Sequence, residues 1–341
     1  MGPVRSPLLA LSIGLAIWAV PARAADLEKA SISLSVGGKT LVAYLPLTIA
    51  ERRGYFTKEG LQVEISDFQG GAKALEALVG GSTDIVCGAY EHTLYMAAKG
   101  ISIKAIALQA NSFGLVVGVQ KDKAASYQLL KDLKGMKIGV TGPGSASAIG
   151  LAMLLGKAGM TANDVSVIGV GGGAAAVAAV KTARLDAIAN FDPVISLLQR
   201  DGAIKTILDT RQEKDLNYLY GGPFAASAFY ADARFVERNP KTVQAFVNGM
   251  VKALHWLQKA SVDDIADALP PEFYAGDKEF YKKAVQANRE MLSKDGVVTP
   301  TLSGNTYRII SSFNESVKNA RIDMAKTYDA SFAENANKAL H

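Results

Sequence analysis

Residues 137–157 read KIGVTGPGSASAIGLAMLLGK and contain one repeating unit of the fold: a short apolar strand, a glycine-rich turn and a helix. Period-two alternation predicts a strand over Lys137–Thr141, and the spacing of apolar residues predicts a helix over Ser145–Lys157. Gly142 and Gly144 lie between them, where glycine lets the backbone turn tightly. This order of elements is typical of βαβ units with largely parallel sheets.

The same alternation runs through residues 31–190 and gives way to helices near the end of the chain. The other predicted strands are Ser31–Val36, Leu61–Ser66, Asp84–Cys87, Ile103–Leu108, Leu115–Val119, Val165–Val170 and Asp186–Asn190. The other predicted helices are Tyr44–Arg53, Gly71–Val79, Ala174–Arg184, Pro240–Lys259, Val262–Ala268, Asp277–Lys294 and Gly304–Ala325. The pattern predicts an α/β protein with a helical C-terminal part.

Two segments of this alternation resemble one another. Residues 34–88 and 136–190 align without a gap, and their apolar strands and turn glycines coincide, for example Gly37 with Gly139 and Asp84 with Asp186. Coincidence between two generic α/β segments is the alternative explanation. We interpret the match as two lobes of similar β-α-β-α-β design.

Composition excludes several classes of protein. The chain has 341 residues, is 49% hydrophobic and 20% charged, and so can build a folded core rather than remain disordered. A single cysteine, Cys87, excludes a disulfide scaffold and a thiolate zinc cluster, and three histidines make a histidine-rich metal site a poor expectation. The formal charge of +5 is spread among acidic residues rather than gathered in a stripe, so we expect no nucleic-acid partner.

The first residues have the pattern of an export signal. Arg5 precedes a largely apolar stretch over Leu8–Val20, and Ala22-Arg23-Ala24 supplies the small residues of a cleavage site. The stretch is too short to span a bilayer as a helix, which argues against the alternative of an uncleaved membrane anchor. We expect residues 1–24 to be a signal peptide, cleaved after Ala24, and the mature protein to be periplasmic or secreted.

Three glycine-rich junctions precede helices: Gly70-Gly71, the turn from Gly142 to Ser145, and Gly171-Gly172-Gly173. Unpaired N–H groups and the positive dipole end of a helix, with glycine allowing close approach, together favour an anion. In open α/β sheets ligands bind at such junctions. Two alternatives stay open: the glycines are turn residues only, and Ser145 is only a helix N-cap.

Motifs of enzymes are weak or absent. Residues 169–174 fit the dinucleotide pattern G-x-G-x-x-A, with Asp192 placed as a ribose-binding acid, but glycine-rich segments meet this pattern often. A G-x-S-x-G nucleophile elbow is missing around Ser145. The sequence therefore predicts no catalytic residues, no metal and no cofactor.

Several segments resemble the solute-binding proteins of nitrate/sulfonate/taurine-type ABC importers, a group related to thiamine-pyrimidine-precursor proteins. Residues 46–63, PLTIAERRGYFTKEGLQV, resemble the family pattern P-x-x-x-A-x-x-x-G-Y-F-x-x-x-G-L-x-V. Gly70-Gly71 followed by Asp84-Ile85 resembles its "G-G … G-x-x-D-I" segment, and DLKGMKIGV at residues 132–140 is similar to D-L-K-G-K-x-I-G-V. The resemblance covers roughly residues 31–260.

The resemblance implies a two-lobed periplasmic binding protein fold, type II-like, each lobe a mostly parallel sheet flanked by helices. It implies a larger lobe over residues 25–116 plus 225–341, a smaller lobe over 117–224, and crossover strands at Leu115–Val119 and Ala226–Tyr230. Hinge closure around a solute and docking on a membrane permease with its ATPase would follow. The implied protein is a monomer that contacts the membrane only through the permease.

The resemblance also implies a ligand site at strand–helix junctions of both lobes. Carried over position by position, it comprises Tyr44, Gln69, Gly70, Gly71, Ala89, Tyr90, Gly144, Ser145, Ala146, Asn190, Phe191 and Asp192, with Glu91, His92 and Phe113 beside them. Alternatives remain open for several of these side chains. His92 is either a ligand contact or a solvent-facing or capping residue, and Glu91 either faces the ligand or does not. The rings of Tyr44, Tyr90 and Phe113 cover the ligand or fill the core, and Asp192 receives an amine or pairs with a backbone amide.

The expected solute is a small organic anion: a sulfonate, a taurine-like aminosulfonate or a carboxylate. Glu91 and Asp192 near the site argue mildly against bare nitrate. The alternative function is an enzyme or binding protein for a thiamine-pyrimidine-type or dinucleotide-type ligand. The resemblance implies a cysteine-rich stretch for the enzymes of thiamine-pyrimidine synthesis, and this chain has only Cys87.

Overall fold

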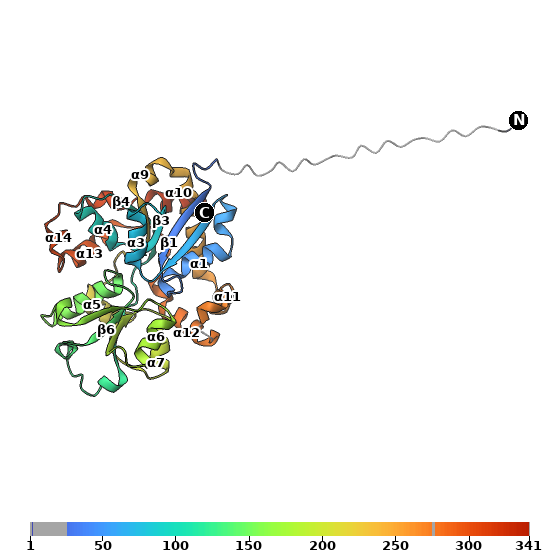
Figure 1. Cartoon of the computed structure of the whole chain (residues 1–341). Helices are drawn as coiled ribbons and strands as arrows, with labels where there is room; N and C mark the ends of the chain where they lie inside the picture. The colour runs from blue at the N-terminus through green and yellow to red at the C-terminus, as the bar shows by residue number, and fades with distance from the viewer. Residues whose placement is uncertain (1, 3–25, 275–276, 341) are drawn as a thin grey trace.

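The computed structural model describes residues 2, 26–274 and 277–340 and has two lobes, each built on a five-stranded sheet (Figure 1). The predicted signal peptide, residues 1–24, lies outside the described residues except for Gly2. Within the described part of the chain, no helix is long and apolar enough to cross a membrane.

The two sheets have the same strand order. The first lobe contains β2-β1-β3-β10-β4 and the second β7-β6-β8-β5-β9. The strands of the first sheet are β1 (Ser31–Gly37), β2 (Gln62–Phe68), β3 (Ile85–Ala89), β4 (Ile103–Ala110) and β10 (Ser227–Asp232). Those of the second are β5 (Val116–Gln120), β6 (Lys137–Val140), β7 (Ser166–Gly169), β8 (Ala187–Asn190) and β9 (Ile204–Asp209).

One strand in each sheet runs against the others and carries the chain between the lobes. β10 pairs antiparallel with β3 and β4, and β5 pairs antiparallel with β8 and β9, whereas β1 with β2 and β6 with β7 are parallel. The mostly parallel sheets with two crossover strands are thus confirmed, each crossover one residue or more later than predicted. The exact lobe limits, 25–116 plus 225–341 and 117–224, stay predictions.

The internal repeat is confirmed by this topology. The first lobe places α3 (Gly71–Val79) between β2 and β3, and the second places α6 (Ala174–Lys181) between β7 and β8. The remaining helices of residues 26–238 are α1 (Leu45–Arg52), α2 (Tyr55–Lys58), α4 (Glu91–Ala98), α5 (Ala146–Lys157), α7 (Val194–Arg200), α8 (Glu213–Tyr220) and α9 (Ala233–Arg238). Single 3-10 turns are η1 (Val42–Tyr44), η2 (Lys121–Lys123), η3 (Leu130–Leu133) and η4 (Ala162–Asp164).

The C-terminal part is helical, as predicted, and mostly belongs to the first lobe. Its elements are α10 (Pro240–Lys259), α11 (Val262–Asp267), η5 (Pro271–Tyr274), α12 (Lys278–Asn288), η6 (Arg289–Met291), α13 (Pro300–Ser311), α14 (Glu315–Asn319), η7 (Met324–Lys326) and α15 (Ser331–Leu340). α10 buries a stripe that includes Phe246, whose ring stacks on Phe56 at 5.1 Å and meets Phe229 of β10 edge-on at 5.0 Å. Figure 1 shows α11 and α12 beside the second lobe, near α6.

Three predicted helices were clearly wrong in length. The helix predicted over Ala174–Arg184 ends at Lys181. The helix predicted over Gly304–Ala325 starts earlier, at Pro300, where the Thr299 hydroxyl caps α13. It is divided because the Asn314 side chain starts a new helix by accepting from the Val317 N–H. The helix predicted over Asp277–Lys294 ends at Asn288, whose amide turns back to the Ala284 carbonyl and also reaches the second lobe.

Candidate solute-binding site between the lobes

The helix starts of α3 and α5 meet where the two lobes touch. The Ser145 hydroxyl, at the start of α5, accepts a hydrogen bond from the Ala72 N–H in the first turn of α3, at 3.1 Å. A Cβ on Gly70 would lie 2.8 Å from the Ser145 Oγ, so glycine is required for this approach. Ser145 holds the N-cap position of α5 but makes no side-chain cap there; its hydroxyl caps the helix of the other lobe instead.

Gly144 places this helix start against the first lobe. Its φ of +76° lies in the left-handed region, and a Cβ there would be 3.6 Å from the Ala72 Cβ. Gly144 is exposed and Ala146, the first residue of α5, is half-buried. The junction therefore remains accessible at its edge, although Ser145 itself is buried.

A buried group of Tyr44, Gly71 and His92 lies next to this contact. His92, in the first turn of α4, is 1% exposed, and a Cβ on Gly71 would meet its Cε1 at 3.4 Å and the Tyr44 hydroxyl at 4.0 Å. The His92 Nδ1 shares a hydrogen bond of 2.8 Å with the Tyr230 hydroxyl of β10, while its Nε2 has no partner. The alternative of a solvent-facing histidine was wrong.

Burial keeps these side chains uncharged. Burial lowers the pKa of His92 to about 4 and raises the pKa of the adjacent Glu91 to about 8. The backbone of Gly144 has a smaller effect that raises the pKa of His92. Burial also raises the pKa of the Tyr44 hydroxyl. Near neutral pH the site thus offers a neutral imidazole and a mainly protonated carboxyl group. The Glu91 Oε2, like the His92 Nε2, is buried without a hydrogen-bond partner.

Asp192 is already paired. Its carboxylate accepts from the Arg211 Nη1 at 2.8 Å, the Asn288 Nδ2 of α12 at 2.6 Å and the Ser196 N–H at 2.9 Å. Its backbone oxygen accepts from the Val42 N–H of the first lobe at 3.0 Å. The backbone pairing, one of the two predicted alternatives, is present and is joined by an ion pair with Arg211; the other alternative, an amine as ligand, stays a prediction. Asp192 thereby joins the second lobe to two elements of the first.

The third glycine junction is covered by side chains. A Cβ on Gly172 would lie 2.7 Å from the Leu41 Cδ2, and the Gln69 Nε2 donates to the Gly169 oxygen at 3.4 Å. The Asn190 Nδ2 donates to the Gly171 oxygen at 2.9 Å, and its Oδ1 accepts from the next N–H along the chain. Gln69 and Asn190 thus hold the segment that resembles a dinucleotide loop.

The predicted aromatic residues divide into two groups. The rings of Phe113 and Phe191 lie 5.4 Å apart, one on each side of the lobe boundary. Tyr90 instead hydrogen-bonds the Thr327 hydroxyl at 2.6 Å, in the C-terminal segment that pairs with Ala105 of β4. Ala89 is buried at the end of β3. The structure therefore brings Phe113 and Phe191 together, but it pairs Tyr90 with the C-terminal segment.

Three residues of this interface were missed by sequence reasoning: Tyr230, Arg211 and Asn288. Tyr230 lies in the predicted crossover strand, which was the available signal that it borders the lobe junction; its hydroxyl contacts His92 of the first lobe. Arg211 and Asn288 fall in no motif, and only the folded chain brings them to Asp192, 19 and 96 residues away in sequence.

The chain has the fold of the periplasmic binding proteins. Its two sheets have the same strand order, each sheet contains one crossover strand, and polar helix starts face each other between the lobes. Family membership is equally plain. The model of the NMT1-like family matches residues 26–269, and the chain belongs to that family.

Solved structures share this architecture. A protein from Bordetella bronchiseptica RB50 is 46% identical, with 92% of this chain and 99% of that chain covered and a TM-score of 0.89. The alkanesulfonate-binding protein SsuA from Xanthomonas axonopodis pv. citri, solved with bound MOPS, is 18% identical, with 89% and 99% covered and a TM-score of 0.69. The second similarity shows the fold alone.

Relatives in sequence have names of two kinds. A Bacillus subtilis protein whose name assigns it to the binding of aliphatic sulfonates is 28% identical, over 85% of this chain and 84% of its own length. A Schizosaccharomyces pombe protein named 4-amino-5-hydroxymethyl-2-methylpyrimidine phosphate synthase is 24% identical, over 74% and 68%. Proteins named as binding proteins and a protein named as a synthase are thus both similar to this chain in sequence.

Proposed function

We propose that the chain is the solute-binding component of an ABC importer, which captures a small organic anion between its lobes and delivers it to a membrane permease. The observation that carries the proposal is the contact of Ser145 with the Ala72 N–H. An oxygen atom of one lobe already accepts from the first turn of a helix in the other lobe, which is the interaction that an anionic oxygen of a solute would make.

Uncharged donors favour an acid held by hydrogen bonds rather than by an ion pair. The His92 Nε2 and the Glu91 Oε2 are buried without hydrogen-bond partners, and a ligand would supply them. Because the pKa of Glu91 is raised, its carboxyl group is mainly protonated near neutral pH. Arg211 has no N–H left for a solute, since its hydrogen bonds go to four other side chains. A sulfonate or carboxylate with a small organic part fits this set, and the names of the binding-protein relatives support it.

Closure would then be a shift between two arrangements of the lobes. We assign the contacts of Ser145 with Ala72 and of Asp192 with Val42 and Asn288 to the closed arrangement, because each of them joins the two lobes. A solute shifts the population only as far as it binds the closed form more tightly than the open one. The closed form is the species that we propose to dock on the permease and its ATPase.

The test is a thermal-shift screen of refolded, ligand-free protein, followed by calorimetric titration of two variants with the strongest binder. Ser145→Asp places a carboxylate at both helix starts, where it repels an anion, and Gly144→Val blocks the approach sterically. A lost charge-assisted hydrogen bond is worth about 1.5–3 kcal/mol, so affinity should fall roughly 10- to 100-fold.

Ser126→Asp is the matched control, because Ser126 is exposed on the same lobe and bonds only the Lys123 carbonyl with its hydroxyl. It should bind the solute as the parent protein does. Unchanged affinity in a folded Ser145→Asp variant would remove the anion site from this junction.

A second candidate, an enzyme acting on a thiamine-type pyrimidine, is favoured only by the names of some relatives. Cys87 is buried and accepts a hydrogen bond from the Gln109 side chain at 3.0 Å, and burial raises the pKa of its thiol, so it is poorly suited to act as a nucleophile. We propose stoichiometric binding without turnover. Sustained product formation from a pyrimidine substrate by the purified protein would reverse that assignment.

A further inference from the structure

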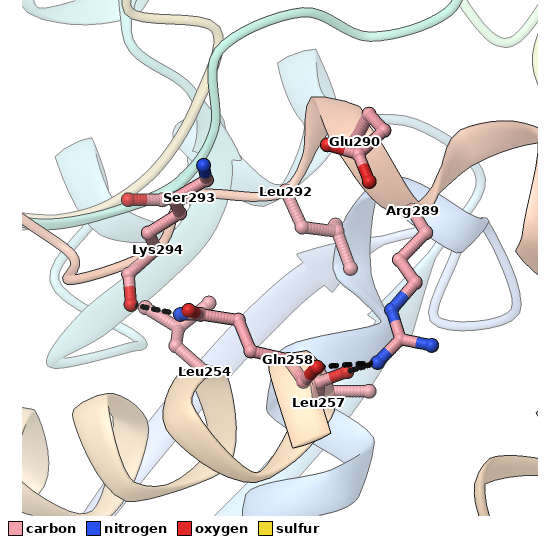
Figure 2. A pocket seen from close by; sticks show the side chains of 8 residues that line it. All are labelled: Leu254, Leu257, Gln258, Arg289, Glu290, Leu292, Ser293 and Lys294. Carbon is pink, nitrogen blue, oxygen red and sulfur yellow. Dashed lines mark hydrogen bonds between the residues drawn. The ribbon is translucent and has the colours of Figure 1, made fainter. Parts of the chain in front are cut away.

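Helix α12 is attached to the first lobe near both of its ends. Lys278, the first residue of α12, forms an ion pair with Asp267 at the end of α11. Just beyond α12, the Arg289 Nη2 donates to the Leu257 and Gln258 carbonyls in the last turn of α10, at 2.5 and 2.7 Å (Figure 2). A cation at the carbonyl end of a helix is favourable, so this contact fixes the end of α12 to α10.

The start of α12 also contacts the second lobe. The Arg200 Nη1, at the end of α7, donates to the Asp277 carboxylate at 2.9 Å, and the Arg200 guanidinium lies over the Phe280 ring, 5.0 Å from its centroid. The ion pair and the cation–π contact both attract α7 to α12. The other Asp277 oxygen accepts from the Phe280 N–H and so caps α12.

A second contact with the second lobe lies at the end of α12, and it is buried. Asn288 is 2% exposed and its Nδ2 donates to the Asp192 carboxylate at 2.6 Å. The next residue, Arg289, binds α10 of the first lobe. Two neighbouring residues at the end of α12 therefore bind opposite lobes, and none of these side chains is exchanged for a solute.

The two contacts lie at different distances from the crossover. A Cβ on Gly114, in the segment that joins β4 to β5, would lie 2.6 Å from the Asn288 Oδ1, so this end of α12 lies against the crossover. At a rise of 1.5 Å per residue, the start of α12 lies about 16 Å further along the helix. A rotation of the lobes about the crossovers would therefore separate Arg200 from Asp277 more than Asn288 from Asp192.

We propose that α12 is a latch that stabilises the closed arrangement of the lobes in the absence of a solute. Both halves of the latch are side chains of the chain itself, so the latch contributes before any ligand arrives. The ligand-free protein then populates mainly the closed arrangement, and a solute needs less differential affinity to complete the closure. This inference rests on the two-lobed fold and not on the identity of the solute.

The test measures the distance between the lobes in ligand-free, full-length mature protein. Glu76→Cys on α3 and Ala175→Cys on α6 place one exposed cysteine on each lobe for nitroxide spin labels, while Cys87 is buried. Double electron–electron resonance then gives the populations of short and long distances. The expected result is that the short distance of the closed arrangement predominates in the parent protein.

Variants of the latch should raise the ratio of open to closed protein. Asp277→Asn removes the ion pair but keeps a good N-cap, and should raise the ratio about two- to fivefold. Arg200→Gln also removes the contact with the Phe280 ring and should raise it roughly two- to tenfold. Arg200→Gln combined with Asn288→Ala should raise it more than about 10-fold, because the second change removes a hydrogen bond to a charged group.

Lys181→Gln is the matched control, because Lys181 is an exposed cation that pairs with Asp201 within the second lobe. It should leave the ratio unchanged. The exposed ion pair keeps the test decisive if Asn288→Ala does not fold. A parent protein that is mainly open, or parent-like distances in both Asp277→Asn and Arg200→Gln, would overturn the proposal. Because no solute is added, failure to find an anionic solute would leave the latch intact, and failure of the latch would leave solute binding intact.

Discussion

Ser145 illustrates what one residue's sequence context can and cannot reveal. A serine after glycine and before an apolar helix predicts an N-cap or an anion contact, and both interpretations follow from local chemistry. The structure gives the hydroxyl to Ala72, 73 residues away and in the other lobe. Such a partner depends on how the lobes meet, which no local pattern encodes. The same reason explains why the pairing of Asp192 with Arg211 and Asn288 was missed.

The protonation states of His92 and Glu91 likewise depend on contacts that the local sequence does not encode. The two residues are adjacent in sequence and both were identified as candidates. Their burial comes from the packing of α4 against β4, α13 and α14 and from the contact of His92 with Tyr230 of β10, none of which a local pattern encodes. Burial then shifts both pKa values toward the neutral form. The pair provides a prediction at the scale of the residue.

Replacing Glu91 with glutamine should flatten the pH dependence of stability between about pH 6.5 and pH 8. The pKa of Glu91 is raised from its usual 4.5 to about 8, so the folded state holds a proton that the unfolded state releases, and stability falls as pH rises through this window. The lowered pKa of His92 acts in the other direction, and only below its usual 6.5. Thermal melting at half-unit pH steps measures the difference, with Glu334→Gln as the control. Parallel melting curves for parent and Glu91→Gln across pH 6.5–8 would contradict the account.

At the scale of the element, apolar periodicity was a good guide and helix ends were a poor one. α3 and α10 have the bounds predicted from their apolar spacing and from Pro240 at the first position of α10. The C-terminal helices were predicted too long because Asn314 and Asn288 use their side chains in caps and tertiary bonds. A polar residue inside a helical pattern looks the same in sequence whether it faces water or ends the helix.

Two glycine substitutions distinguish a position where only glycine fits from a position that accepts a side chain. Gly37→Ala, at the end of β1, would place a Cβ 2.1 Å from the Gly71 backbone nitrogen and should destabilise the protein by about 3 kcal/mol or more. Gly156→Ala, within α5, meets nothing within 4 Å and should stabilise it by a few tenths to about 1 kcal/mol. Urea unfolding of both variants measures these differences. Equal stability of the two would show that the β1–α3 junction is not packed as described.

At the scale of the whole molecule, the ungapped match of residues 34–88 with 136–190 was enough to predict two similar lobes. The identical strand orders of the two sheets agree with it. The sequence did not predict how β10 pairs in the first sheet or how α12 contacts the second lobe, because these contacts join residues that are far apart in the sequence. That the lobes meet at strand–helix junctions was predictable; the particular contacts between them, such as Ser145 with Ala72, were not.

Export is the prediction for the intact chain. We expect the mature protein to begin at Ala25, after removal of residues 1–24 by a signal peptidase that recognises Ala22-Arg23-Ala24. N-terminal sequencing of material from the periplasmic fraction measures the start. A chain that begins at Met1 in the membrane fraction would disprove the proposed localisation.

The most direct measurement of the central claim is a calorimetric titration of refolded, ligand-free mature protein with small organic anions: ethanesulfonate, taurine and propionate, with nitrate as the inorganic comparison. We predict that one of the organic anions binds at one molecule per chain, and that Ser145→Asp weakens this binding roughly 10- to 100-fold while Ser126→Asp leaves it unchanged. No binding of any of these anions by a protein that melts cooperatively, or binding that Ser145→Asp does not affect, would contradict the claim that the chain closes its two helix starts around an acid.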